Sequence, residues 1–207
     1  MNEQLSAKKD PHYTDTENWF SADAQFDQLY PAYTQLLARR HWTPLAVAKK
    51  AAHFLAAESN ARILDIGSGA GKFCLAAAHY KPDAFYYGIE QRKRLVSQAE
   101  AARKMLGIEN VSFRVGNFTQ VNFRNYDHFY FYNPFYENIS GTDKIDNSID
   151  YSLELYNYYN RYLYTQLEQK PPGTRLASFH SLEDEMPQGY HIVGTEMNEL
   201  LKFWIKI

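Results

Sequence analysis

Residues 65–73 read Asp-Ile-Gly-Ser-Gly-Ala-Gly-Lys-Phe, and this stretch decides the fold. It follows an apolar run over 61–66 that is typical of a buried strand, and it leads into a helical pattern over 71–80. Glycine at every second position lets the backbone turn sharply and removes the Cβ atoms that would keep a ligand at a distance. A glycine-rich turn in this setting, between a strand and a helix, indicates a binding site.

The spacing of the glycines excludes two of the ligand classes that such turns bind. A dinucleotide fingerprint needs glycine at its first, third and sixth positions, but the sixth position counted from Gly67 is Lys72. A phosphate loop needs a hydroxyl residue after Gly71-Lys72, and the sequence has Phe73 there. The pattern that remains is acidic-x-Gly-x-Gly-x-Gly. A tight turn that binds no ligand is the alternative interpretation.

Strands and helices alternate along the rest of the chain. The expected strands are 61–66, 84–89, 111–115, 129–132, 175–179, 190–193 and 202–207, and the expected helices between them are 71–80, 91–106 and 148–169. This alternation indicates a mostly parallel sheet with both faces covered. We therefore expect an α/β fold with a doubly wound, seven-stranded sheet, whose C-terminal hairpin supplies the only antiparallel strand.

The N-terminal part differs from this pattern. Residues 1–17 are polar and are expected to form a mobile tail. Residues 18–207 are expected to form a single domain that begins with a helical cap over 18–58, in which Pro31 separates two short helices.

Composition narrows the class of protein. The 207 residues carry 22 Lys and Arg against 24 Asp and Glu, a net charge of −2, so no overall basic field favours duplex nucleic acid as a partner. The single cysteine, Cys74, excludes an intrachain disulfide and fits a reducing compartment. No apolar run approaches the roughly 18 residues of a membrane span, and the first residues lack the apolar segment of a signal peptide. We expect a cytoplasmic protein.

The glycine pattern in this context resembles that of the class I (Rossmann-like) S-adenosylmethionine-dependent methyltransferases, over residues from about 43 to 207. The resemblance implies the class I methyltransferase fold and S-adenosyl-L-methionine as the cofactor. It also implies that the turn wraps the methionine portion of the cofactor and that the acidic residue helps to hold its amino group. The residues concerned are Asp65, Gly67, Ser68, Gly69 and Gly71.

Three further stretches match the cofactor-binding pattern of this family. Glu90 ends the second expected strand, where a carboxylate can accept hydrogen bonds from ribose hydroxyls. Asn117 stands where the family commonly has aspartate, and its side-chain oxygen can accept from the adenine amino group, while Phe118 can pack on the adenine face. Thr43 and Pro44 resemble the helix start that lines the cofactor site of amino-group methyltransferases. A plain N-cap at Thr43 with Pro44 at the first helical position explains the same two residues.

The fourth strand runs into Asn133-Pro134-Phe135-Tyr136, which resembles the Asn-Pro-Pro-Tyr motif of methyltransferases that act on planar amino groups. Phe135 replaces the second proline, so the motif does not transfer the identity of the substrate. The Asn133 side-chain oxygen and the Pro134 carbonyl are acceptors for the N–H groups of a conjugated amine, and Tyr136 offers an aromatic face. An Asn-Pro turn beside aromatic core residues is the structural alternative.

The proposed reaction is methyl transfer to an amino group of a protein or small-molecule acceptor. Acidic residues between 137 and 154 form an expected rim that favours cationic amines over phosphate backbones; these are Glu137, Asp143, Asp146, Asp150 and Glu154. The alternatives are an adenine-N6-type nucleic-acid methyltransferase, an aminopropyltransferase, and a non-catalytic cofactor-binding regulatory or scaffold protein.

Other features are interpreted as structural. The tyrosines of 148–169 are expected to pack against the sheet, Cys74 is expected in the core, and the histidines show no metal-ligand clustering. The run 91–94, Gln-Arg-Lys-Arg, is expected to be a solvated helix start, and contact with phosphate is its functional alternative.

Overall fold

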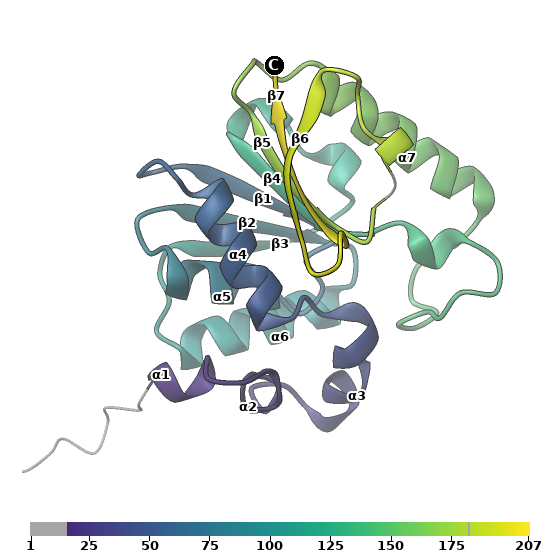
Figure 1. Ribbon diagram of the computed structural model, residues 1–207. Helices are drawn as coiled ribbons and strands as arrows, with labels where there is room; N and C mark the ends of the chain where they lie inside the picture. Colours follow the sequence, from purple (N-terminus) through teal and green to yellow (C-terminus); the bar gives the residue numbers. More distant parts are fainter. Residues whose placement is uncertain (1–15, 182) are drawn as a thin grey trace, which may run out of the picture.

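Seven strands form one mixed sheet in the computed structural model (Figure 1), which describes residues 16–181 and 183–207. The strands are β1 (Arg62–Ile66), β2 (Phe85–Glu90), β3 (Val111–Val115), β4 (His128–Tyr132), β5 (Arg175–Phe179), β6 (Tyr190–Glu196) and β7 (Leu201–Lys206). Their order across the sheet is β3-β2-β1-β4-β5-β7-β6. The first five pair in parallel, and β7 runs antiparallel to both of its neighbours. The predicted fold class is confirmed.

Helices cover both faces of this sheet. They are α1 (Thr16–Trp19), α2 (Asp23–Asp27), α3 (Ala32–His41), α4 (Leu45–Leu55), α5 (Lys72–Tyr80), α6 (Lys93–Met105) and α7 (Leu153–Glu168). Short 3-10 turns lie at η1 (Phe118–Gln120), η2 (Phe123–Asn125), η3 (Tyr136–Asn138) and η4 (Glu183–Glu185). Figure 1 shows α4, α5 and α6 on one side of the sheet and α7 on the other.

Alternation along the strands divides the core into two layers. In β1, Ile63 packs with the residues of α4 and α5, whereas Leu64 and Ile66 pack with the side that α7 covers. On that side, α7 buries three residues that follow one another at intervals of one helical turn: Tyr159, Leu163 and Leu167. The expected packing of the tyrosine-rich helix is therefore confirmed for Tyr159, which is 7% exposed.

The long helix begins later than predicted. It starts at Leu153 instead of 148, because the Ser152 hydroxyl accepts a hydrogen bond from the Leu155 amide at 3.1 Å and caps the helix there. Tyr151 consequently lies before the helix, in the connection from β4.

The start of α4 differs from the expectation for Thr43 and Pro44. Pro44 is the N-cap and Leu45 the first helical residue of α4, so Thr43 does not cap the helix. The Thr43 hydroxyl instead pairs with the Tyr130 hydroxyl at 2.9 Å inside the core, and the Leu45 amide donates to Asp23 at 2.9 Å. Residues 1–15 of the predicted tail lie outside the described residues, while Thr16 and Glu17 already belong to α1.

The strand order places the site. β1 lies between β2 and β4, so the chain reverses its direction of winding at β1, and parallel sheets bind ligands outside the carboxyl ends of strands at such a point. The residues that meet there are Ile66, Glu90 and Tyr132, the last residues of the three strands. In the part of the chain that the structure describes, no helix is long and apolar enough to cross a membrane.

Candidate active site

A cavity of about 510 Å³ opens at the carboxyl ends of β1, β2 and β4. The glycine turn, the end of β2, the segment after β4 and the last turn of α3 all contribute to its wall. The predicted site residues that line it are Gly67, Gly69, Glu90, Asn133, Pro134 and Tyr136. A volume of this size is in the range of small-molecule sites. The structure thus brings together residues that are up to 69 positions apart along the chain, the distance from Gly67 to Tyr136.

The glycine turn is tightly packed against protein atoms. Gly67 and Gly69 both have positive φ, +75° and +55°. A Cβ at Gly69 would lie 2.5 Å from the Trp42 ring, and one at Gly67 would lie 2.9 Å from Pro134 Cβ. Glycine is therefore required here for the backbone conformation and for contact with Trp42 and Pro134. The expectation that these glycines mainly clear space for a ligand is therefore corrected: the space beside them is occupied by Trp42 and Pro134.

Asp65 lies under the turn and does not line the cavity. It is 3% exposed, and its Oδ2 accepts a hydrogen bond from the Cys74 thiol at 3.6 Å. Burial raises the pKa of Asp65 to about 8, the thiol hydrogen bond opposes this shift, and the charge of Glu90 adds to it. Cys74 is buried, as predicted. Close by, the buried Ser68 hydroxyl has no hydrogen-bond partner within residues 16–181 and 183–207.

Glu90 is a buried carboxylate with both oxygens held. Oε2 accepts from the Gly69 amide at 3.2 Å, which ties the end of β2 to the glycine turn. Oε1 accepts from the Arg92 amide at 2.9 Å and from the Arg92 guanidinium at 3.2 Å. Glu90 is thereby oriented where the cavity and a second, smaller hollow meet, and it lines both.

That second hollow, which we call the nucleoside hollow, has a volume of about 40 Å³. Phe118 lines it, as predicted, and stacks on Phe135 with ring centroids 5.0 Å apart. Asn117 does not line it. Its Oδ1 accepts from the Thr119 amide as the cap of η1, and its amide group donates to the Tyr159 hydroxyl at 2.7 Å. The turn-residue interpretation explains these contacts of Asn117.

The segment after β4 presents the predicted acceptor-binding residues. Asn133 has φ +35°, a strained conformation for a residue with a side chain and one that is concentrated at functional sites. Its side-chain amide makes no hydrogen bond to the part of the chain that the structure describes, and Asn133 is part of the cavity lining. Tyr136 is 49% exposed at the rim.

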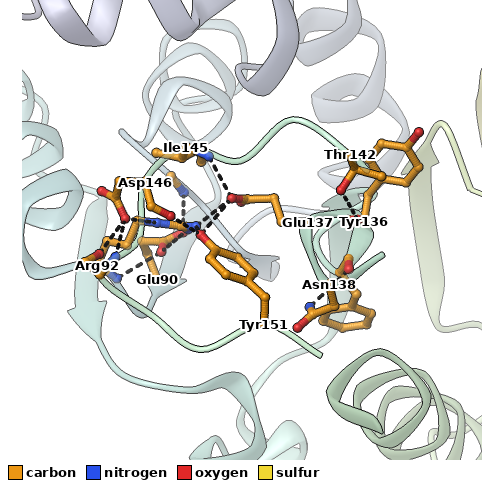
Figure 2. A network of polar contacts seen from close by, with 12 residues as sticks. Glu90, Arg92, Tyr136, Glu137, Asn138, Thr142, Ile145, Asp146 and Tyr151 are labelled. Atoms are coloured by element: carbon orange, nitrogen blue, oxygen red, sulfur yellow. Dashed lines mark hydrogen bonds and ion pairs between the residues drawn. The ribbon is translucent and has the colours of Figure 1, made fainter. Parts of the chain in front are cut away.

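Sequence reasoning missed the residue that organises this end of the site. Arg92, 5% exposed, bonds to the Glu137 carboxylate at 2.7 Å, the Tyr151 hydroxyl at 2.7 Å and the Asp146 carboxylate at 3.2 Å, besides Glu90 (Figure 2). The expectation of a solvated helix start at 91–94 is therefore wrong for Arg92. Its partners lie 45 to 59 positions away in sequence, so no local pattern signals the pairing.

Two histidines and a tryptophan also line the cavity. Burial lowers the pKa of His41 and of His180, which favours their neutral forms. Trp42 belongs to the wall, whereas its neighbours Thr43 and Pro44 do not. Among the described residues, no group of three or more His, Cys, Asp or Glu is placed to hold a metal ion.

Comparison with known proteins agrees with the fold. A family model described as a methyltransferase domain matches residues 57–140. The tRNA (guanine-N(7)-)-methyltransferase of Synechococcus sp. (strain JA-3-3Ab) is 48% identical over 54 residues, which are 26% of this chain and 23% of that protein. The chain thus matches about a quarter of the length of this relative.

Solved structures share the fold. TrmN from Thermus thermophilus superposes with a TM-score of 0.58 at 19% identity, over 82% of this chain and 51% of that one. An RNA methyltransferase from Salinibacter ruber, solved with S-adenosyl-L-homocysteine, gives 0.54 at 21% identity, over 79% and 91%. The expected resemblance is confirmed at this level: the chain has the fold of these methyltransferase structures, and a methyltransferase-domain model matches residues 57–140.

Proposed function

We propose that this protein transfers a methyl group from S-adenosyl-L-methionine to a nitrogen atom in a planar, conjugated group of its acceptor. The observation that carries the proposal is one cavity of about 510 Å³ whose lining includes the glycine turn, Glu90 and Asn133-Pro134. A methyl donor beside Glu90 and an acceptor beside Asn133 would share this cavity and lie next to each other.

The residues on the donor side fit this cofactor. Its ammonium group needs a negative partner, and the candidate is Asp65, which lies beneath the cavity, has no cationic partner among the described residues and would be favoured in its charged form by a bound ammonium. Its ribose needs hydrogen-bond acceptors, and Glu90 is oriented at the meeting point of the two hollows. When bound, the cofactor supplies an already activated methyl group. The protein then has to align the reactants and exclude water.

The acceptor side supplies hydrogen-bond acceptors instead of a strong base. A nitrogen conjugated into a planar group has a poorly available lone pair, so its N–H groups must be held as it pyramidalises. The Asn133 amide oxygen, which has no hydrogen-bond partner among the described residues, is suited to this task. The aromatic rings of Tyr132 and Tyr136 line the same wall and offer faces for a planar group.

Three of the five carboxylates behind the expected preference for a cationic acceptor are already paired with arginines. Asp143 pairs with Arg40 at 2.7 Å, and Asp146 pairs with Arg92 and Arg94. Glu137 is likewise bound to Arg92. Carboxylates that are already paired attract a cation weakly. A base of RNA is therefore the second candidate acceptor, and the names of the Synechococcus relative and of the Salinibacter ruber structure favour it.

Radiolabelled cofactor tests the proposal. Purified protein is incubated with methyl-labelled S-adenosylmethionine and separated RNA, protein and small-molecule fractions of a cell lysate. We expect label in one fraction, at a nitrogen, and a rate at least about tenfold lower for Asn133→Ala with cofactor affinity unchanged. Cofactor binding without label in any fraction would instead support the scaffold alternative.

A further inference from the structure

The nucleoside hollow is too small for the group that it would receive. Its volume of about 40 Å³ leaves room for only a few water molecules, against roughly 300 Å³ or more for a typical ligand site. Part of its wall comes from Ile149, Asp150 and Tyr151, which lie between β4 and α7. If a nucleoside binds beside Glu90, these residues must move.

Residues 146–151, which we call the covering segment, have firm attachments on both sides. Ile145 before it is buried in the core, and its amide donates to Glu137 at 2.8 Å. Ser152 after it caps α7. Among the described residues, no backbone–backbone hydrogen bond joins the covering segment itself to the rest of the chain. Its position therefore depends on side-chain contacts.

Arg92 provides the central contacts of this kind. Its guanidinium bonds to Asp146 at 3.2 Å and to the Tyr151 hydroxyl at 2.7 Å, so it holds both ends of the covering segment. The Tyr151 hydroxyl is also 2.6 Å from the Asp146 carbonyl and 3.1 Å from Glu137. Figure 2 shows these side chains converging on Arg92 beside Glu90. Because Arg92 is buried, solvent does not screen these contacts as it screens a surface ion pair.

We propose that Arg92 is a positioning residue that fastens the covering segment across the nucleoside hollow, and that the cofactor reaches its site only when this fastening opens. The inference rests on the proposed function, since it assumes that the nucleoside of the cofactor binds beside Glu90. Only the open fraction of the protein accepts the cofactor, so the fastening slows association. The same contacts delay release once the segment has closed over the bound nucleoside.

Association kinetics with S-adenosyl-L-homocysteine test this proposal without any knowledge of the acceptor. Tyr151→Phe removes the hydroxyl that bonds to Arg92 but leaves the contacts between Arg92 and Glu90 in place. We expect this variant to raise the association rate constant at least about tenfold, and to raise the dissociation rate constant as well. Arg92→Gln should raise the association rate similarly, although its loss of contact with Glu90 lowers the equilibrium affinity.

The matched control is Arg94→Gln. Arg94 also bonds to Asp146, at 3.3 Å, but its side chain is 49% exposed, so its loss should leave both rate constants within about twofold. A structural defect alone would not accelerate association. If Arg92→Gln fails to fold, Tyr151→Phe decides the outcome.

The outcomes separate the two proposals. If the unaltered protein binds S-adenosylhomocysteine but Tyr151→Phe associates with it at a rate within about twofold of the unaltered protein, Arg92 does not fasten the covering segment. The proposed function then remains intact. No binding to the unaltered protein overturns both.

Discussion

At the scale of single residues, Glu90 has two tasks that one carboxylate can perform together. Oε1 accepts from the Arg92 amide and guanidinium, whereas Oε2, among the described residues, accepts only from the Gly69 amide and still has capacity for a ribose hydroxyl. Glu90→Gln keeps the shape of the side chain but removes the negative charge that strengthens these hydrogen bonds. We expect S-adenosylhomocysteine binding to weaken by about 1–3 kcal/mol, measured by titration calorimetry.

The control for this change is Glu109→Gln, an exposed glutamate before β3, which should leave the affinity unaltered. An affinity change of less than about twofold for Glu90→Gln would remove Glu90 from the cofactor site.

Asp65 makes the free energy of unfolding depend on pH. Its pKa is raised from 3.8 to about 8 in the folded state, chiefly by burial. Between these values the folded protein holds a proton that the unfolded chain has released. The free energy of unfolding therefore falls as the pH rises from about 4 to about 8, and this contribution stays lost above that range.

The neutral variant Asp65→Asn removes this contribution. Denaturant unfolding of both proteins at pH 5, 7 and 9 should show the variant gaining stability relative to the unaltered protein as the pH increases. A difference in stability that is the same at all three values would contradict the assignment of the raised pKa to Asp65.

At the scale of elements, the N-terminal helices are fastened to the glycine turn by a buried cation. Lys72, the first residue of α5, is 3% exposed, and its ammonium lies 2.7 Å from Asp27 and 2.7 Å from Asp23. Asp27 is the more buried of the two partners. Asp27→Ala leaves the buried ammonium with one half-exposed partner.

We expect Asp27→Ala to lower the free energy of unfolding by about 1–3 kcal/mol, read from urea denaturation. The exposed Asp83, in the turn before β2, is the matched position. If Asp83→Ala lowers the free energy of unfolding as much as Asp27→Ala does, within about 0.5 kcal/mol, Lys72 does not fasten these helices.

Element types could be predicted from sequence because strand and helix periodicities are local. The start of α4 could not be predicted, because the Thr43 hydroxyl can either cap the nearby helix or bond to a residue that is distant in sequence. Its hydroxyl bonds to Tyr130, 87 positions away, instead of capping the helix. The same limit applies to Asn117, whose partner Tyr159 lies 42 positions away.

At the scale of the whole molecule, the sheet order and the position of the cavity follow from the alternation of elements and the glycine turn. The wall residues Gly67, Gly69, Glu90, Asn133 and Pro134 were predictable because each ends or follows a parallel strand. Arg92 was not predictable, since its burial arises from a segment that folds back over it after β4. An arginine beside Lys93 and Arg94 in a polar run has the sequence signature of a surface residue.

The central claim is that the glycine turn and Glu90 form the binding site of S-adenosylmethionine. Titration calorimetry of the unaltered protein with S-adenosylmethionine and with S-adenosylhomocysteine tests it most directly. We predict one site per chain with a dissociation constant on the order of 1–100 μM for both compounds. The absence of any binding heat with either compound, at several temperatures and at protein concentrations well above this range, would contradict the account.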